Sequence, residues 1–153
     1  MIPVQRLNHA VLYVRDAPRA AAFYHDVFGF EVVVEAPGAA FLRAAGSANH
    51  HDLGLFSLGP DASGPMRGAV GLYHLAWEVA SVRDLVQARS VLRDRGAYVG
   101  ESDHGATKSV YGRDPDGNEF EVMWLVPRDD WGGDERAATT TRLDLDAEIA
   151  RHG

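Results

Sequence analysis

The sequence predicts an α+β protein built from two similar modules, each running strand, helix and then three strands. The first observation is a repeat: Leu-Tyr-His-Leu-Ala-Trp-Glu-Val at residues 72–79 nearly copies Leu-Asn-His-Ala-Val-Leu-Tyr-Val at residues 7–14, with leucine, histidine and valine at matching positions. The second is a glycine- and proline-rich segment at residues 58–69, which is typical of a linker. After this segment the pattern of strand and helix signals starts again.

The first module begins with a strand expected at residues 7–14, whose apolar residues on both faces fit a strand that is covered on both sides. A helix follows, because Asp16 suits an N-cap, Pro18 suits a first turn, and the apolar spacing ends at Gly29, a residue type common at left-handed helix ends. Apolar segments rich in β-formers and separated by turn residues predict three more strands. We expect these strands at residues 30–35, 40–44 and 52–57.

The second module repeats this order after its first strand at residues 72–79. Ser81, with Asp84 three residues later, forms a weak capping box at the start of an amphipathic helix that Gly96 closes. Asp-Pro-Asp-Gly at residues 114–117 predicts a tight turn, since proline presets φ and glycine accepts a positive φ. The remaining strands are expected at residues 98–101, 107–113 and 118–125.

The carboxy-terminal tail differs in kind from the modules, because it is rich in aspartate, glycine and threonine. Its leucines 143 and 145 and Ile149 predict either a short helix that packs back on the body or a frayed end. The expected division is a single domain at residues 1–127, with module one at 5–58 and module two at 70–127, followed by the tail at 128–153.

Composition limits the functional classes. The chain has 153 residues, 46% hydrophobic and 24% charged, which is ordinary for a globular protein. A formal net charge of −7 without a basic cluster argues against nucleic acid or an anionic membrane as partner. No apolar run is long enough to cross a bilayer and no basic leader is present, so we expect a cytoplasmic protein. With no cysteine, any metal must be held by nitrogen and oxygen.

His9 and His74 occupy matching positions in two strands expected to be buried, where an unpartnered polar ring is costly. A shared ligand, most naturally a metal, would explain the pair. In the last strand Glu119 and Glu121 share a face, so one glutamate points toward whatever the histidines point toward. Two histidines and a carboxylate form the facial triad of non-haem iron(II) enzymes, although zinc, manganese or nickel suits the same ligands. The competing interpretation is a pair of hydrogen-bonded core histidines and a surface glutamate.

These histidines, together with Tyr-Gly-Arg-Asp-Pro-Asp-Gly-Asn-Glu-Phe-Glu at residues 111–121, resemble the vicinal oxygen chelate superfamily of glyoxalases, epimerases, bleomycin- and fosfomycin-resistance proteins and extradiol dioxygenases. The resemblance covers residues 5–125. It implies that eight strands form one open, cup-shaped mixed sheet with helices outside. It also implies that a metal inside the cup is held by His9, His74 and Glu121.

Four local resemblances point to single-domain relatives of catechol 2,3-dioxygenase. They are His-His-Asp-Leu-Gly-Leu at residues 50–55, Asp-His-Gly at 103–105, Tyr111 ten residues ahead of the glutamate ligand, and Leu-Asp-Leu-Asp at 143–146. Members that resemble glyoxalase I generally carry a fourth ligand on the last strand of module one. Here that strand offers only Asp52, at its edge.

The resemblance implies an iron(II) enzyme, with manganese, nickel or zinc as alternatives, that cleaves a catecholic diol with O₂. His51 would shuttle protons, with His104 next, and Tyr111 would hydrogen-bond the chelated substrate oxygen. Each has a structural alternative: a strand edge for His51, a turn cap for His104 and a satisfied core hydroxyl for Tyr111.

A homodimer is expected, with modules that pair within one chain or swap between two. The alternative functions are a glyoxalase-, epimerase- or fosfomycin-type metalloenzyme of the same superfamily, and a metal-free protein that sequesters a drug.

Overall fold

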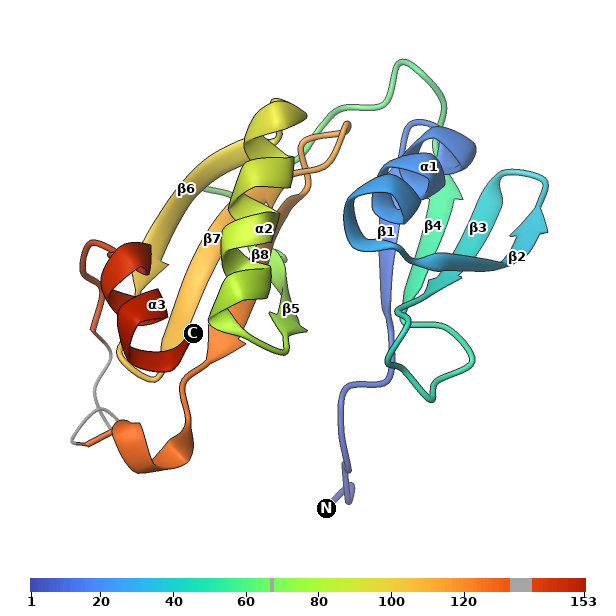
Figure 1. The fold of residues 1–153 in the computed structure, drawn as a ribbon. Helices are drawn as coiled ribbons and strands as arrows, with labels where there is room; N and C mark the ends of the chain where they lie inside the picture. Colours follow the sequence, from blue (N-terminus) through green and yellow to red (C-terminus); the bar gives the residue numbers. More distant parts are fainter. Residues whose placement is uncertain (67, 133–138) are drawn as a thin grey trace. The chain divides into compact units, whose positions relative to one another are not determined.

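The computed structural model describes residues 1–66, 68–132 and 139–153. The chain forms two compact units, an amino-terminal unit at Met1–Pro65 and a carboxy-terminal unit at Met66–Gly153 (Figure 1). Each unit contains a four-stranded mixed sheet with strand–helix–three-strand order, which confirms the predicted α+β class and modules. Within the described ranges, no helix has the length and apolar character needed to span a membrane.

The amino-terminal unit arranges its sheet in the order β1-β4-β3-β2. The first strand pairs in parallel with the fourth, and the other two pairings are antiparallel. The first and last strands of the module therefore lie side by side. The elements are β1 (Ala10–Val14), α1 (Ala17–Phe28), β2 (Glu31–Ala36), β3 (Ala39–Arg43) and β4 (Leu53–Ser57).

Helix α1 begins and ends where the local signals predict. The Asp16 carboxylate accepts a hydrogen bond from the Arg19 amide at 2.9 Å, and Gly29 follows the helix with a φ of 68°, which a residue with a Cβ adopts only at a cost. The helix packs against β2, β3 and β4. Its fully buried Tyr24 joins Leu42 and Leu55 in the core of this unit.

Strand β1 differs from the prediction in two ways. It begins at Ala10 rather than residue 7, so His9 immediately precedes the strand. It is also buried on one face only, because Leu12 and Val14 are buried whereas Val11 and Tyr13 are exposed. The apolar alternation indicated the strand, but it could not show how far the pairing with β4 extends.

The carboxy-terminal unit has the same topology, with sheet order β5-β8-β7-β6 and a parallel pair formed by its first and last strands. Helix α2 packs against this sheet, above fully buried residues such as Val110, Phe120 and Val122. The elements of the module are β5 (His74–Val79), α2 (Val82–Asp94), β6 (Tyr98–Asp103), β7 (Thr107–Arg113) and β8 (Glu119–Leu125).

The turn that leads into β8 is held by its own aspartate. The Asp114 carboxylate accepts hydrogen bonds from the backbone amides of Asp116 and Asn118, both at 2.9 Å, and from the Asn118 side chain. Gly117 has a φ of 90°, as the turn signal requires. These contacts fix where β8 starts and therefore which of its residues face each side of the sheet.

The tail returns to the carboxy-terminal unit. After a short 3₁₀ helix at Arg128–Asp130, the described chain resumes at Thr139 and ends in α3 (Leu145–His152), which packs against α2. The Asp144 carboxylate caps α3 by accepting a hydrogen bond from the Ala147 amide, and Leu143 and Leu145 are buried. The tail is thus part of the same compact unit as the second module.

Candidate functional site

A cavity of about 620 Å³ opens on the carboxy-terminal sheet. Its wall includes four residues that the sequence singled out: His74, His104, Tyr111 and Glu121. Glu121 alternates along β8 with the core residues Phe120 and Val122, so the cavity lies on the face opposite α2. Strand phase had predicted that Glu119 and Glu121 share a face, and both line the cavity.

His74 and Glu121 lie in contact. The parallel register of β5 and β8 pairs His74 with Glu119, which brings Glu121 diagonally beside the histidine. The His74 Nε2 atom lies 3.0 Å from Glu121 Oε2, and the other carboxylate oxygen accepts a hydrogen bond from the Ser109 hydroxyl on β7. Both Glu121 oxygens thus have a neighbour, and the residue is only 9% exposed.

The pair fits two ligands of one divalent metal ion. Donors about 2.1 Å from a shared ion and about 90° apart are separated by about 3 Å, which matches the 3.0 Å between Nε2 and Oε2. The buried Nδ1 atom of His74 has no hydrogen-bond partner among the described residues. Across residues 1–66, 68–132 and 139–153, no three histidine, aspartate or glutamate side chains gather as a metal site. The third predicted ligand, His9, belongs to the other unit.

Tyr111 and His104 form a second pair on the cavity wall. The Tyr111 hydroxyl lies 2.8 Å from His104 Nε2, and its ring centroid lies 5.8 Å from that of His74. Burial raises the pKa of Tyr111 above its usual value, and the negative charge of Glu121 raises it further. The phenol therefore keeps its proton at neutral pH and can donate it in a hydrogen bond.

His9 and His51 lie together in the amino-terminal unit. Their ring centroids are 4.5 Å apart, and the His51 ring also packs against Phe41. Burial lowers the pKa of His51, and the nearby His9 and His50 lower it further. The six predicted site residues thus fall into two groups, with His9 and His51 in one unit and His74, His104, Tyr111 and Glu121 in the other.

Asp52, the edge carboxylate of the first module, is committed to its own loop. It accepts hydrogen bonds from the Ala44 amide at 2.9 Å and from the Ser47 and Asn49 side chains, both at 2.7 Å. Burial opposes the ionisation of Asp52, but these hydrogen bonds outweigh it and hold its pKa below the usual value. The carboxylate is therefore already satisfied without a metal.

Sequence reasoning missed other residues at the site. Ser109 does not line the cavity, but its hydroxyl donates to Glu121; it follows the same alternation along β7 as Tyr111, so its strand phase was a usable signal. Thr140 lines the cavity, but it comes from the polar threonine run of the tail, where no periodic pattern indicates a partner.

Comparison with known proteins independently supports the family resemblance. A family model described as Glyoxalase/Bleomycin resistance protein/Dioxygenase superfamily matches residues 6–122. Biphenyl-2,3-diol 1,2-dioxygenase 3 of Rhodococcus globerulus is 39% identical over 127 residues, which are 80% of this chain and 65% of that protein. Catechol-2,3-dioxygenase of Bacillus subtilis is 31% identical over 151 residues, which are 96% of this chain and 52% of that protein. The chain thus spans about half to two thirds of the length of these relatives.

Solved structures share the fold. Lactoylglutathione lyase from Agrobacterium tumefaciens has a TM-score of 0.60 and 30% identity, with 80% of this chain and 96% of that chain covered. A glyoxalase/dioxygenase from Nostoc punctiforme has a TM-score of 0.67 and 20% identity, with 83% and 97% covered, which is a likeness of fold. The family model matches most of the chain, and both modules are present. The chain therefore belongs to the glyoxalase, bleomycin resistance protein and dioxygenase superfamily.

Proposed function

We propose that the protein is a divalent-metal-dependent extradiol-type dioxygenase that cleaves a catecholic aromatic diol with O₂. The observation that carries the proposal is the His74–Glu121 pair at 3.0 Å on the wall of a cavity that also holds the His104–Tyr111 pair. The relatives named biphenyl-2,3-diol and catechol dioxygenases support the same chemistry.

The proposed ligand set is His74 and Glu121 together with His9. His9 would come from the same chain or from the partner chain of a proposed homodimer. Ferrous iron is the proposed ion. A relative from Geobacillus genomosp. 3 is named a manganese-dependent 2,3-dihydroxybiphenyl 1,2-dioxygenase, at 27% identity over 130 residues, so manganese is the first alternative, ahead of nickel and zinc.

Three protein ligands favour a site that must also take a substrate. A bound divalent metal ion would act as a Lewis acid that eases loss of a proton from the diol and leaves coordination positions open for both reactants. Asp52, the carboxylate at the edge of the last strand of module one, is held by three hydrogen bonds in its own loop. This commitment supports a three-ligand site.

The other residues would bind and orient the substrate. The Ser109 hydroxyl holds one Glu121 oxygen and leaves the second facing His74. Tyr111 presents its hydroxyl at the cavity wall, where it would hydrogen-bond a substrate oxygen. His51 is the proposed proton shuttle because its ring lies beside His9, the third proposed ligand.

The test is anaerobic reconstitution of the full chain with ferrous iron, followed by oxygen and a panel of catechol and 2,3-dihydroxybiphenyl. We expect oxygen consumption matched by a coloured ring-opened product. Glu121→Gln should reduce both by at least about 100-fold, because it weakens a metal ligand whose charge the ion requires. Parallel samples reconstituted with manganese, nickel and zinc identify the metal.

The matched control is Glu78→Gln, an exposed glutamate on β5 that does not line the cavity. This variant should retain oxygen uptake. If protein shown to contain iron or manganese consumes no oxygen with any diol, the proposal is wrong.

A lyase or isomerase is the second candidate, favoured by the 30% identity to the Agrobacterium lactoylglutathione lyase structure. Such an enzyme would use a metal without consuming oxygen. The same reconstituted samples separate the two functions, because turnover of a glutathione hemithioacetal without oxygen uptake would favour the lyase.

A further inference from the structure

The carboxy-terminal tail contacts His104 directly. The Thr139 carbonyl oxygen lies 2.9 Å from His104 Nδ1, and the Thr140 hydroxyl lies 3.2 Å from the same nitrogen. On the opposite side of the ring, Nε2 lies 2.8 Å from the Tyr111 hydroxyl. The imidazole of His104 therefore connects a backbone group of the tail to a phenol on the cavity wall.

These contacts define where the protons of the neutral ring lie. A carbonyl oxygen can only accept, so Nδ1 must carry the hydrogen that it donates to Thr139. In neutral histidine Nε2 is then an acceptor, and the Tyr111 hydroxyl must donate to it. With its hydrogen directed to His104, the Tyr111 oxygen offers lone pairs, rather than a proton, to a ligand in the cavity.

The tail is fastened to the same turn that carries His104. Thr141 forms an antiparallel bridge with Asp103, in which each backbone amide donates to the other's carbonyl, at 3.0 and 2.9 Å. The Asp103 carboxylate accepts hydrogen bonds from the Gly105 amide at 2.8 Å and from Lys108 Nζ at 2.6 Å. Tail, turn and strand β7 thus meet at one aspartate.

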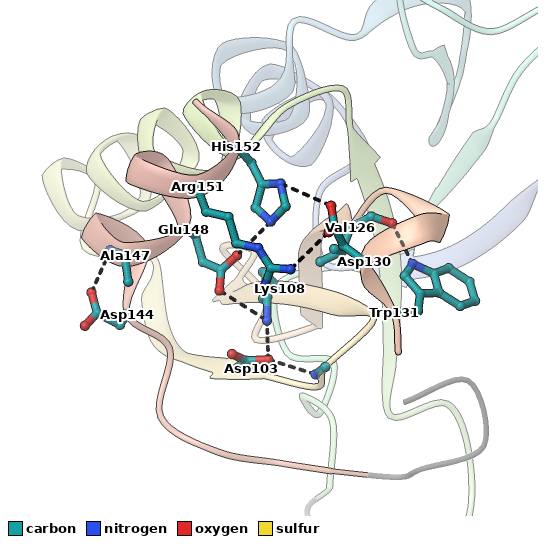
Figure 2. Close-up of polar contacts among 11 residues, drawn as sticks. Asp103, Lys108, Val126, Asp130, Trp131, Asp144, Ala147, Glu148, Arg151 and His152 are labelled. Carbon is teal, nitrogen blue, oxygen red and sulfur yellow. Dashed lines mark hydrogen bonds and ion pairs between the residues drawn. The ribbon is translucent and has the colours of Figure 1, made fainter. Parts of the chain in front are cut away.

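Lys108 extends this connection to α3. Its side chain is 8% exposed, and its ammonium also lies 3.4 Å from the Glu148 carboxylate on α3 (Figure 2). A buried ammonium needs nearby carboxylates, so docking of α3 and placement of Asp103 stabilise each other. Farther along α3, Arg151 pairs with Asp130 at 3.0 Å, as Figure 2 also shows.

We propose that the tail residues Thr139–Thr141, anchored by the Asp103 bridge and by α3, are a positioning element of the cavity. The Thr139 carbonyl holds His104 as the Nδ1–H tautomer. This tautomer makes Tyr111 a hydrogen-bond acceptor toward the substrate. Tyr111 then accepts a hydrogen bond from a hydroxyl that the bound diol retains. This last step rests on the proposed dioxygenase function, whereas the tautomer does not.

The test is a long-range ¹H–¹⁵N NMR correlation on zinc-loaded full-length protein labelled with ¹⁵N-histidine, which reports which ring nitrogen carries the proton. His104→Gln assigns the signals by their loss. We expect His104 to be protonated on Nδ1 and not on Nε2 in the unsubstituted protein. Protonation on Nε2 alone would overturn the proposal.

Two variants separate the tail from local effects. Thr141→Pro removes the amide that donates to Asp103, and it should lose the Nδ1–H signal in favour of Nε2–H. Thr140→Val removes only the nearby hydroxyl and keeps the Thr139 carbonyl, so it should retain the original pattern. If Thr141→Pro folds and keeps the original pattern, the tail does not set the tautomer. If it does not fold, Glu148→Gln provides the same comparison, because it weakens the Lys108 contact without changing the backbone.

A kinetic readout completes the test. In active protein, Thr141→Pro should reduce kcat by about 10- to 100-fold, as expected when a supporting hydrogen bond is lost, while the exposed control Glu78→Gln should change it little. An Nδ1–H tautomer in a protein that consumes no oxygen would refute the proposed function and leave the positioning role intact. Oxygen consumption by a protein with the Nε2–H tautomer would refute the positioning role and leave the proposed function intact.

Discussion

Asp52 illustrates how one side chain stabilises a loop that carries two candidate site residues. Its carboxylate accepts three hydrogen bonds across residues 44–49, and its backbone amide donates to Leu42 at 2.8 Å. The adjacent His51 is thereby held beside His9. Because these hydrogen bonds favour the ionised form, the pKa of Asp52 in the folded protein lies below the 3.8 of an unperturbed aspartate.

This shift predicts a pH-dependent contribution to stability. A group whose pKa is lower in the folded state contributes its full stabilisation at pH values above its pKa in the unfolded state. The contribution is lost as the pH falls through its pKa in the folded state. Asp52→Asn should reduce the free energy of unfolding by about 1–3 kcal/mol at pH 7, and the difference should shrink as the pH falls from 5 to 3. Urea unfolding at each pH measures it. Asp61→Asn, at an exposed position, should show little difference at any pH; a constant deficit for Asp52→Asn would contradict the assignment.

Gly112 marks a limit of prediction at the same scale. A Cβ added there would lie 2.6 Å from the Phe120 ring, so only glycine fits between β7 and the aromatic side chain. In the sequence Gly112 is one glycine among sixteen. Its neighbour Tyr111 shows no positional signal for the His104 contact, which the sequence did not predict.

Elements defined by local chemistry were predictable from the sequence, whereas contacts between distant segments were not. The caps at Asp16 and Ser81 and the turn ending at Gly117 all form as expected, because each depends on a few adjacent residues. Strand alternation indicated that Glu119 and Glu121 share a face, and both line the cavity. The bridge from Thr141 to Asp103 joins residues separated by a whole strand pair, and no local pattern encodes it.

The attachment of α3 predicts an unequal effect of two basic residues. Lys108 is buried between the Asp103 and Glu148 carboxylates, whereas Arg151 is 59% exposed beside Asp130. Lys108→Met should reduce the free energy of unfolding by about 3–5 kcal/mol, because it leaves two carboxylates together without their cation. Arg151→Met should cost less than about 1 kcal/mol. Urea unfolding with hydrogen exchange of α3 amides distinguishes them, and equal effects would refute the anchoring role of Lys108.

At the scale of the whole molecule, the candidate ligands are divided between two compact units, with His9 in one and His74 and Glu121 in the other. The matching positions of His9 and His74 suggested a shared ligand, and the family resemblance implied the full set with Glu121.

A shared ion predicts that zinc stabilises the protein through both units. Zinc at about 100 times its dissociation constant should raise the free energy of unfolding by about 3 kcal/mol. His9→Ala and His74→Ala should each abolish most of the rise, and His50→Ala should preserve it. Thermal unfolding with and without zinc measures the difference. A full rise in His9→Ala would show that the site is confined to the carboxy-terminal unit.

The strand order also determines when each unit can fold during synthesis. In both sheets the last strand made is an interior one, since β4 lies between β1 and β3 and β8 lies between β5 and β7. The amino-terminal sheet is complete once Ser57 has left the ribosome, whereas the second sheet has an open gap until Leu125 emerges. A chain that stops before residue 119 would expose the edges of β5 and β7, which favours aggregation. Because Glu121 lies on β8, the strand that closes the sheet also brings the carboxylate of the site.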